Sequence, residues 1–289
     1  MKKFCIVIPI YKAPSLLERE TIKNMFGKIK PTYDVYYVCP ERFKDEHDVV
    51  DEYRMLPDLN TTHNITFTYF PDKYFESPSS YSQLCLLDDF YRTFSEYEYM
   101  YILQLDVWIF RDEFEYWCSI GYDYIGGPII SKGSLWQHLP NVGNGGFSLR
   151  KISTFIDICD KNGILRTSYP EIDKVWDSVE IEDKFICDTL KYIYHLEMPK
   201  VHDAFLFAWD QNANYIYENL TKRMPFGAHA IDKQIMFWRE HIKQIDNDEI
   251  LRYELTKVFH TLINKYGLAQ AKKMIEHNRR YVEDYDTYQ

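Results

Sequence analysis

A chain of 289 residues, of which 46% are hydrophobic, is long enough to bury one large α/β core. Its 34 basic and 44 acidic side chains give a formal net charge of −10, which disfavours nucleic acid and anionic membranes as partners because both select basic surfaces. Aromatic residues make up 17% of the chain, an excess that suits carbohydrate or protein contact and that AT-rich coding would also produce.

Cysteine usage and the N-terminal sequence predict the cellular compartment. The six cysteines are widely spaced and form no Cys-x-x-Cys pair, so we expect buried free thiols. The N-terminus reaches Pro9 without the apolar h-region of a signal peptide, and no apolar run approaches the ~18 residues of a membrane span. We therefore expect a cytoplasmic protein without an integral membrane segment.

Strand and helix patterns alternate through the first part of the chain. Apolar runs rich in β-formers predict strands over residues 4–11, 34–39 and 65–70, each with a proline in it or directly after it. Ser15 followed by Glu18 is a capping box, which predicts a helix that runs to about Lys28. The charged segment 41–56 predicts an exposed helix. This alternation predicts a mostly parallel, doubly wound sheet flanked by helices.

The remaining patterns predict further helices and one more late strand. Helices are expected over residues 81–94, 111–118, 151–162 and 182–195, a strand over 205–209, and a charged helical region from Asp246 to about Lys272. The loop-like segment 131–140 is either a lid over an acceptor site or an ordinary surface loop. We expect one α/β domain over residues 1–240 and a helical C-terminal extension over residues 241–289 packed on it.

The stretch Met100–Phe110 is an apolar run of strand-forming residues that contains a single carboxylate, Asp106. A continuous apolar run is typical of a central parallel strand covered on both faces, and ligands of open α/β sheets bind beyond the carboxyl ends of such strands. Asp106 is therefore expected at a ligand crevice. The alternative is that Asp106 caps the helix that follows.

Several well-known catalytic motifs are absent from the sequence. The chain has no G-x-x-x-x-G-K-[ST] and no G-x-G-x-x-G, since Gly143, Gly145 and Gly146 do not have that spacing. It also lacks H-E-x-x-H and a serine in a G-x-S-x-G elbow. Kinase, P-loop, dinucleotide-binding and these hydrolase functions are disfavoured.

Four segments after the Asp106 strand form a recognisable series: GYDYIGGP at 121–128, NVGNGGFSLR at 141–150, Glu182-Asp183, and PFGAH at 225–229. In this order they resemble a family of GT-A-fold glycosyltransferases known mainly as a domain of unknown function. The resemblance spans roughly Phe4 to Trp238 and implies a GT-A-like catalytic domain that uses a nucleotide sugar. Many GT-A enzymes carry Asp-x-Asp at the strand end, whereas Trp108 fills the second Asp position here, which leaves the usual mode of metal binding open.

The resemblance also implies roles for individual residues. Asp183 is the expected general base and Glu182 a ligand of acceptor or donor hydroxyls, although acids in the first turn of a helix also favour its macrodipole without any catalytic role. Asp106 and His229 are the expected ligands of a divalent cation, Mn²⁺ or Mg²⁺, and His229 is alternatively a loop residue. The expected donor and nucleotide-binding residues are Pro9, Tyr11, Tyr81, Gln104, Asp106, Trp108, Arg111, Asn144, Gly145 and Gly146.

Two of these assignments have explicit alternatives. Arg111 is a candidate to bind phosphate directly, which would lessen the need for metal. Asn144-Gly145-Gly146 is compatible with a type I′ hairpin turn, and also with a backbone left bare so that the donor sugar can approach it. The two interpretations can hold together.

The sequence thus predicts an inverting glycosyltransferase that moves a sugar from a nucleotide sugar, with UDP as the expected nucleotide, to a glycan or other hydroxyl acceptor. The inverting assignment follows from a placed base and the absence of an evident nucleophile. One alternative is a sugar-phosphate nucleotidyltransferase, but the segment Ile8–Ala13 lacks the glycines that usually accompany that activity. The other is a non-catalytic glycan-binding module, suggested by the single strand-end aspartate and the aromatic excess.

Overall fold

The computed structural model of the chain describes residues 1–57, 63–129, 141–162, 176 and 178–270. Within these ranges the central strands are β1 (Lys2–Pro9), β2 (Asp34–Pro40), β3 (Asn64–Phe70), β4 (Tyr97–Leu103), β6 (Tyr124–Gly126) and β9 (Phe147–Lys151). They form a sheet in the order β3-β2-β1-β4-β9-β6, in which β1 to β4 are parallel and β9 is antiparallel to both neighbours. The predicted α/β class with a mostly parallel sheet is confirmed.

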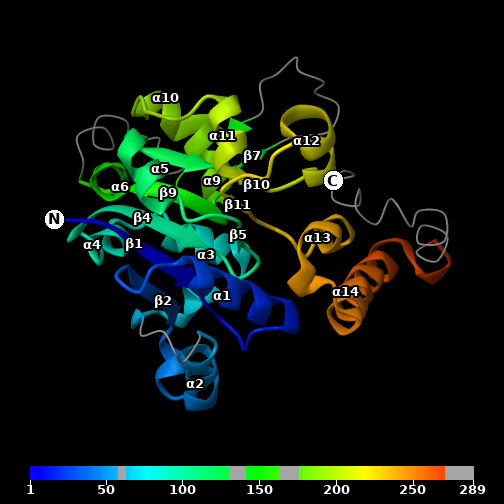
Figure 1. Cartoon of the computed structure of the whole chain (residues 1–289). Helices are drawn as coiled ribbons and strands as arrows, with labels where there is room; N and C mark the ends of the chain where they lie inside the picture. The colour runs from blue at the N-terminus through cyan, green and yellow to red at the C-terminus, as the bar shows by residue number, and fades with distance from the viewer. Residues whose placement is uncertain (58–62, 130–140, 163–175, 177, 271–289) are drawn as a thin grey trace.

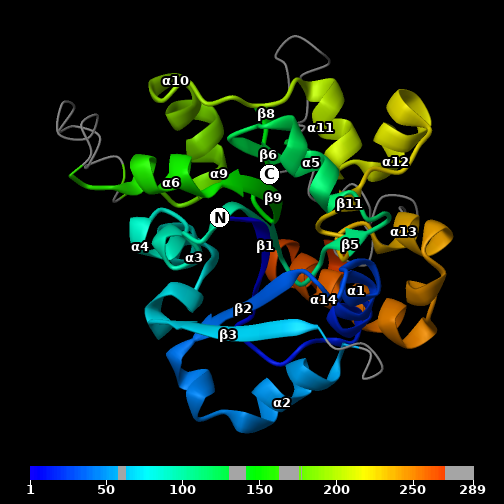
Figure 2. The ribbon, with the colours of Figure 1, turned by 60° about the vertical axis from the view of Figure 1, so that its left-hand side comes forward.

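Helices cover both faces of this sheet because alternate residues of its inner strands are apolar on both sides (Figures 1 and 2). Ile6 and Ile8 of β1 pack with one apolar cluster, whereas Cys5 and Val7 pack with another. The first cluster includes side chains of α1 (Leu16–Lys28), α2 (His47–Met55) and α5 (Phe114–Ile120). The second includes side chains of α3 (Pro78–Leu84), α4 (Asp88–Arg92) and α6 (Ile152–Cys159).

A third apolar cluster joins the C-terminal helices to a small second sheet. This sheet has the order β10-β11-β5 and is formed by β10 (Ala208–Trp209), β11 (Gly227–Ala228) and β5 (Trp108–Ile109). Its cluster includes residues of α12 (Ala213–Ile216), α13 (Ile235–His241) and α14 (Asp248–Tyr266). Ile250 of α14 packs in the same cluster as Ile235 and Trp238 of α13, and the predicted domain boundary at residue 240 falls inside α13.

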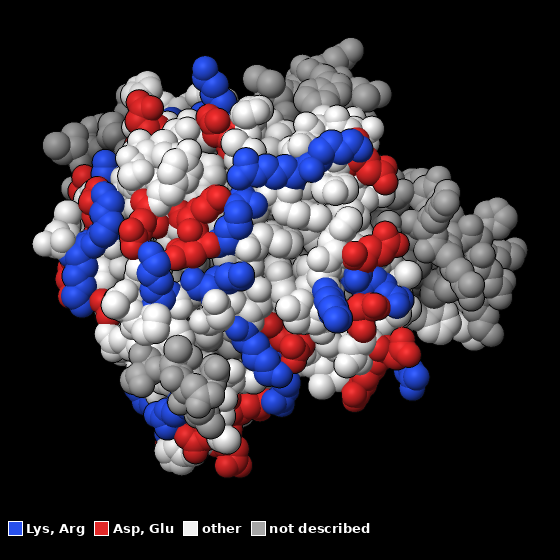
Figure 3. All heavy atoms as spheres, in the orientation of Figure 1, with Lys and Arg blue, Asp and Glu red and all other residues white. Residues whose placement is uncertain are grey.

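The remaining described elements are short. They are the strand pair β7 (Pro128–Ile129) and β8 (Asn141–Val142), the helices α9 (Glu182–Phe185), α10 (Lys191–Ile193) and α11 (Val201–Phe207), the 3₁₀ turns η1 (Glu41–Lys44), η2 (Asp72–Phe75) and η5 (Lys243–Ile245), and the π-helical turns η3 (Ile186–Leu190) and η4 (Tyr217–Thr221). No described helix is both long and apolar enough to cross a membrane. On the face shown in Figure 3, acidic and basic side chains lie interspersed.

Local signals predicted the first elements well. Ser15 Oγ accepts from the Glu18 N–H at 3.3 Å and the Ser15 N–H donates to Glu18 Oε2 at 2.7 Å, so the capping box that starts α1 is confirmed, as is its end at Lys28. The observed β2 and β3 each differ from prediction by one residue at one end. All six cysteines are buried and free, as predicted.

The predicted strand Met100–Phe110 is not a single strand. β4 ends at Leu103, and the chain turns through Asp106, with the Val107 N–H donating to the Gln104 carbonyl at 3.1 Å. Trp108 then enters the second sheet as part of β5. An apolar run does not reveal a turn when both sides of that turn are buried, which is the case here.

Other predicted elements differ in type or length. Residues 205–209 are mostly the end of α11, since periodicity alone does not separate a short buried helix from a strand. The predicted helix 81–94 is two helices, α3 and α4, and 41–56 is η1 followed by α2. The helices predicted from 111 and 151 begin later, at Phe114 and Ile152, and the one predicted over 182–195 ends at Ile193. The loop-like segment 131–140 lies outside the described residues.

Candidate active site at the carboxyl edge of the sheet

A cleft of about 960 Å³ opens where the parallel strands end. Its wall includes Tyr11–Ser15 after β1, Phe75–Pro78 after β3 and Gln104–Asp106 after β4. Asn144, Glu182 and residues of α14 complete the wall. This is the edge at which open α/β sheets bind ligands, and Asp106 lies on it as the sequence predicted.

Strand pairing brings two segments that are distant in sequence to Asp106. Because β9 runs antiparallel to β4, the residues before β9 reach the carboxyl end of β4, where the Gln104 N–H donates to the Gly146 carbonyl at 2.9 Å. In the second sheet Ala228 of β11 pairs with Trp108 of β5, so His229 follows directly beside the Asp106 turn. The Asp106 carbonyl accepts from the Ile231 N–H at 3.4 Å, which fixes the segment after His229.

His229 and Asp106 form the first of two acidic groups at the cleft. His229 Nε2 lies 3.3 Å from Asp106 Oδ1 and 3.0 Å from Gln104 Oε1. On the other side of the ring, Nδ1 lies 2.8 Å from Asp210 Oδ1, and Asp210 is only 4% exposed. Asp210 therefore orients the imidazole so that Nε2 faces Asp106 and Gln104.

The charges in this group support one another. Burial by itself would lower the pKa of His229, but Asp106 and Asp210 together raise it to about 10. Burial works to raise the pKa of Asp106, but the neighbouring His229 outweighs it and holds the pKa below its ordinary value. Asp106 is thus an ionised carboxylate throughout the neutral range.

The same atoms fit a divalent cation, which would take the place of the proton on Nε2 of His229. Among the residues that the structure describes, no three His, Cys, Asp or Glu side chains cluster as metal ligands. Here, however, the Gln104 amide oxygen adds a third donor to Asp106 and His229. An amide oxygen, a carboxylate and an imidazole backed by a carboxylate are donors that Mn²⁺ or Mg²⁺ accepts. Gln104, predicted as a donor-binding residue, thus lies beside Asp106 at a distance that would let both contact one cation.

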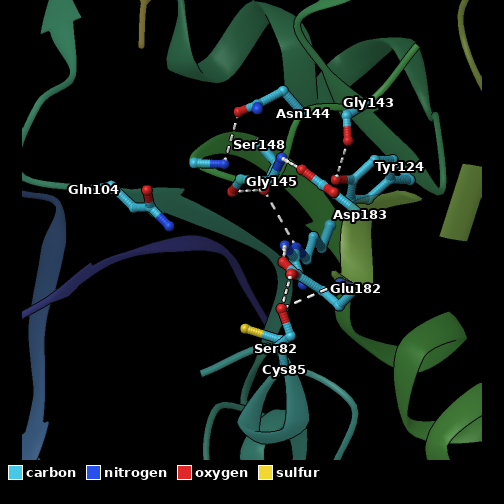
Figure 4. A network of polar contacts seen from close by, with 12 residues as sticks. Ser82, Cys85, Gln104, Tyr124, Gly143, Asn144, Gly145, Ser148, Glu182 and Asp183 are labelled. Carbon is cyan, nitrogen blue, oxygen red and sulfur yellow. Dashed lines mark hydrogen bonds and ion pairs between the residues drawn. The ribbon is translucent and has the colours of Figure 1, made fainter. Parts of the chain in front are cut away.

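Glu182 and Asp183 form the second acidic group, and Glu182 links three elements of the fold. Its Oε1 lies 3.0 Å from Nη2 of Arg150, which is fully buried, and its Oε2 accepts from Ser82 Oγ at 2.8 Å (Figure 4). Arg150 comes from β9, Ser82 from α3 and Glu182 from α9. Glu182 lines the cleft, but both of its oxygens are engaged by the protein.

Asp183 lies on the other side of the glycine loop from Gln104 (Figure 4). Its Oδ2 accepts from the Gly145 N–H at 2.8 Å and its Oδ1 from its neighbour Lys184 at 2.6 Å. Burial and the charge of Glu182 raise the pKa of Asp183 to about 6. The carboxylate does not line the cleft, since the Gly145 backbone lies between.

Gly145 and Gly146 are required because other side chains lie close to their backbone, and not because a hairpin turn needs them. Of Asn144, Gly145 and Gly146, none has a positive φ, so the predicted type I′ turn is wrong; the positive φ belongs to Gly143, at +135°. A Cβ on Gly146 would overlap the His229 ring, and one on Gly145 would lie 2.7 Å from Glu182 Oε1. At both positions the space that a side chain would occupy is filled by His229 or Glu182.

Comparison with known proteins assigns the chain to a family. The family described as "Protein of unknown function (DUF5672)" matches residues 64–229, more than half of the chain. The chain belongs to the DUF5672 family.

Solved structures show distant similarity to this DUF5672 chain. Mouse xyloside xylosyltransferase 1 in its apo form matches with a TM-score of 0.48 and 10% identity, covering 80% of this chain and 98% of that one. An active-site mutant of LgtC matches with a TM-score of 0.47 and 14% identity, covering 78% of this chain and 86% of that one. No curated protein matches the chain in sequence.

The matched DUF5672 segment contains both acidic groups, whereas Tyr11 and the α14 part of the cleft wall lie outside it. The predicted residues that line the cleft are Pro9, Tyr11, Tyr81, Gln104, Asp106, Asn144 and Glu182. His229, Asp183 and the two glycines lie directly behind that wall.

The structure does not bring two of the predicted donor-binding residues to the cleft. Trp108 is 4% exposed and belongs to the third apolar cluster. The Arg111 guanidinium is held by Glu113 at 2.7 Å and by the Met224 carbonyl at 2.8 Å, away from the cleft wall. Asp210 and Arg150 were not predicted as site residues, although Arg150 ends the NVGNGGFSLR segment and Asp210 directly follows an apolar run.

Proposed function

We propose that this protein is a glycosyltransferase that moves a sugar from a nucleotide sugar, with UDP as the nucleotide, to a hydroxyl group of a glycan or other acceptor. Such a transfer needs compensation for the charge of the leaving diphosphate, a base for the acceptor hydroxyl and an enclosed pocket. The observation that supports it best is that the group around Asp106 and the Glu182-Asp183 pair both lie at one cleft of about 960 Å³.

Gln104, Asp106 and His229 would hold the cation. A bound Mn²⁺ or Mg²⁺ would supply positive charge that neutralises the diphosphate of the donor. The chain's own contribution is the fixed orientation of these three side chains, with Asp210 holding the imidazole. Lys12, Lys233 and Lys257 also line the cleft and add positive charge along it.

We assign the general base to Asp183 and hydroxyl binding to Glu182, in an inverting reaction. The acceptor oxygen forms its bond to the anomeric carbon while the bond to the diphosphate breaks, and Asp183 takes the hydroxyl proton. A pKa raised to about 6 leaves Asp183 ionised at neutral pH yet more basic than an ordinary aspartate. Because the Gly145 backbone separates Asp183 from the cleft, this assignment requires a water that carries the proton to its carboxylate.

A nucleotide-sugar hydrolysis screen with Mn²⁺ and with Mg²⁺ tests this proposal. We expect the protein to consume at least one UDP-sugar slowly with water as acceptor, and the Asp106→Ala variant, prepared identically, to lose this activity. If no nucleotide sugar is consumed and calorimetry detects no UDP binding in the presence of either metal, the proposal is wrong.

A non-catalytic glycan-binding protein is the second candidate. It is favoured by one observation: both oxygens of Glu182, the acid on the cleft wall, are already engaged by Arg150 and Ser82. Calorimetry with UDP distinguishes the two functions, because a glycan-binding module is not expected to bind the nucleotide.

A further inference from the structure

Part of the cleft wall is built by residues that the matched family segment does not include. Asp232 and Lys233 follow His229 in the chain, and Tyr253, Glu254 and Lys257 come from α14. All of them lie after residue 229, where the family match ends. The C-terminal helix, expected to be an extension packed on the domain, is therefore part of the cleft wall.

Two carboxylates in this part of the cleft wall, those of Asp232 and Glu254, form ion pairs with the same lysine. Lys257 Nζ lies 2.8 Å from Glu254 Oε2 and 3.8 Å from Asp232 Oδ2. The second oxygen of each carboxylate, Glu254 Oε1 and Asp232 Oδ1, is buried and has no hydrogen-bond partner within the described part of the chain. Glu254 is 2% exposed although it lines the cleft.

Buried acceptors without donors are energetically unfavourable, and a site that keeps them is suited to a ligand that supplies the donors. Burial and the charge of Asp106 raise the pKa of Asp232 to about 6, as expected for a carboxylate short of hydrogen-bond donors. The exposed part of the Asp232 side chain, 27%, leaves it accessible from the cleft.

The neighbouring side chains indicate what kind of donor fits. Tyr11 and Tyr253 line the same cleft and are 46% and 47% exposed, so each presents an aromatic ring to a ligand. Aromatic rings pack against the C–H faces of a sugar while its hydroxyls turn to polar groups. A phosphate would be repelled by the two carboxylates, and a cation would meet the Lys257 ammonium already between them.

We propose that Asp232 and Glu254 form a subsite that binds neighbouring hydroxyl groups of a sugar ring, with Lys257 bridging the two carboxylates. The proposal rests on the function proposed above and deepens it, since α14 then decides which sugar the cleft accepts. Two rings have the required chemistry: the ribose of the nucleotide and a ring of the acceptor glycan.

Calorimetry with paired probes distinguishes the two rings. The probes are UDP and its 2′,3′-dideoxy analogue, each with Mn²⁺, and a glycan array probed with fluorescently labelled full-length protein. The variants are Glu254→Gln and Asp232→Asn, with Glu249→Gln as the control because Glu249 is an exposed acid on the same helix. Thermal midpoints show that each variant is folded, and the more exposed Asp232 provides a second test if Glu254→Gln does not fold.

If the subsite binds ribose, the wild type and the control Glu249→Gln bind UDP about tenfold or more tightly than the dideoxy analogue, because the analogue cannot form the charge-assisted hydrogen bonds. Glu254→Gln and Asp232→Asn then lose this preference for UDP. If it binds the acceptor, UDP affinity is unchanged and the two variants lose array signals that the control keeps. Variants that match the wild type with every probe, or a wild type that binds none of them, overturn the proposal. If array signals depend on Glu254 and the protein does not bind UDP, the subsite is supported and the transferase function is refuted.

Discussion

The two acidic groups on either side of the Asn144–Gly146 loop hold their carboxylates in opposite electrostatic states. Asp106 faces the imidazole of His229, which keeps its pKa below the ordinary value. Asp183 is buried next to a second carboxylate, Glu182, and its pKa rises to about 6. The same residue type is thus set to remain ionised in one group and to exchange a proton near neutral pH in the other, and the partner makes the difference.

The largest expected effect is at Asp106. Asp106→Ala should lower transfer by at least about 10³-fold, because the ionised carboxylate that holds the cation is gone. Initial rates with the best donor from the screen measure this, with Asp203→Ala as the control, since Asp203 is a partly exposed acid of α11 away from the cleft. Turnover near the wild-type rate would remove Asp106 from the reaction.

The next effect tests the other acidic group. Asp183→Asn keeps the shape of the side chain and removes the basic oxygen, so we expect a loss of about 10²–10⁴ in rate with donor binding retained. Glu182→Gln is the comparison, because Glu182 lines the cleft and Asp183 does not. If Glu182→Gln loses turnover and Asp183→Asn does not, the base assignment must be exchanged.

The pH dependence sharpens the same prediction. The wild-type rate should rise as pH increases through about 6, where Asp183 loses its proton, and this limb should be absent from Asp183→Asn. An unfolded aspartate titrates near 3.9, so the folded state binds the proton more tightly and this residue's contribution to stability declines as pH rises from about 4 to 6. Thermal midpoints measured across this range should show a larger decline in the wild type than in Asp183→Asn, because Asp232, whose pKa is also raised to about 6, contributes equally to both proteins.

A smaller effect is expected behind His229. Asp210→Asn leaves an acceptor for the Nδ1 hydrogen but removes the charge, so affinity for Mn²⁺ should fall by about 10–100-fold. Metal titrations followed by UDP calorimetry measure the change, with Asp203→Asn as the control. Identical titration curves for Asp210→Asn and the wild type would show that Asp210 has no part in holding a cation.

The smallest expected effect concerns the loop that separates the two groups. Gly146→Ala places a methyl group against the His229 ring and should cost about 1–3 kcal/mol of stability, with lowered metal affinity. Gly27→Ala is the matched control, because a Cβ there meets nothing within 4 Å and alanine favours the helix. A Gly146→Ala protein as stable and as active as the wild type would mean that the ring has room to move.

Much of the fold followed from local sequence signals. The capping box at Ser15 and the β-rich runs of β1 to β3 predicted the alternating elements because their signals depend on neighbouring residues alone. The presence of Asp106 just beyond the carboxyl end of a strand was visible for the same reason. The strand predicted across Met100–Phe110 was wrong because burial on both sides of a turn hides the turn in an apolar pattern.

The sequence by itself determined which chemical groups are present: a strand-end aspartate, a late histidine, an acid pair and a glycine-rich segment. Only the tertiary structure decided how they are grouped. The antiparallel pairing of β9 with β4 and of β11 with β5 brings Gly146 and His229 to Asp106 over distances that no local pattern records. Of the predicted donor-binding residues, Gln104 lines the cleft and Trp108 packs in the core, and α14 joins the cleft, because contacts between distant segments decide which side chain faces the ligand.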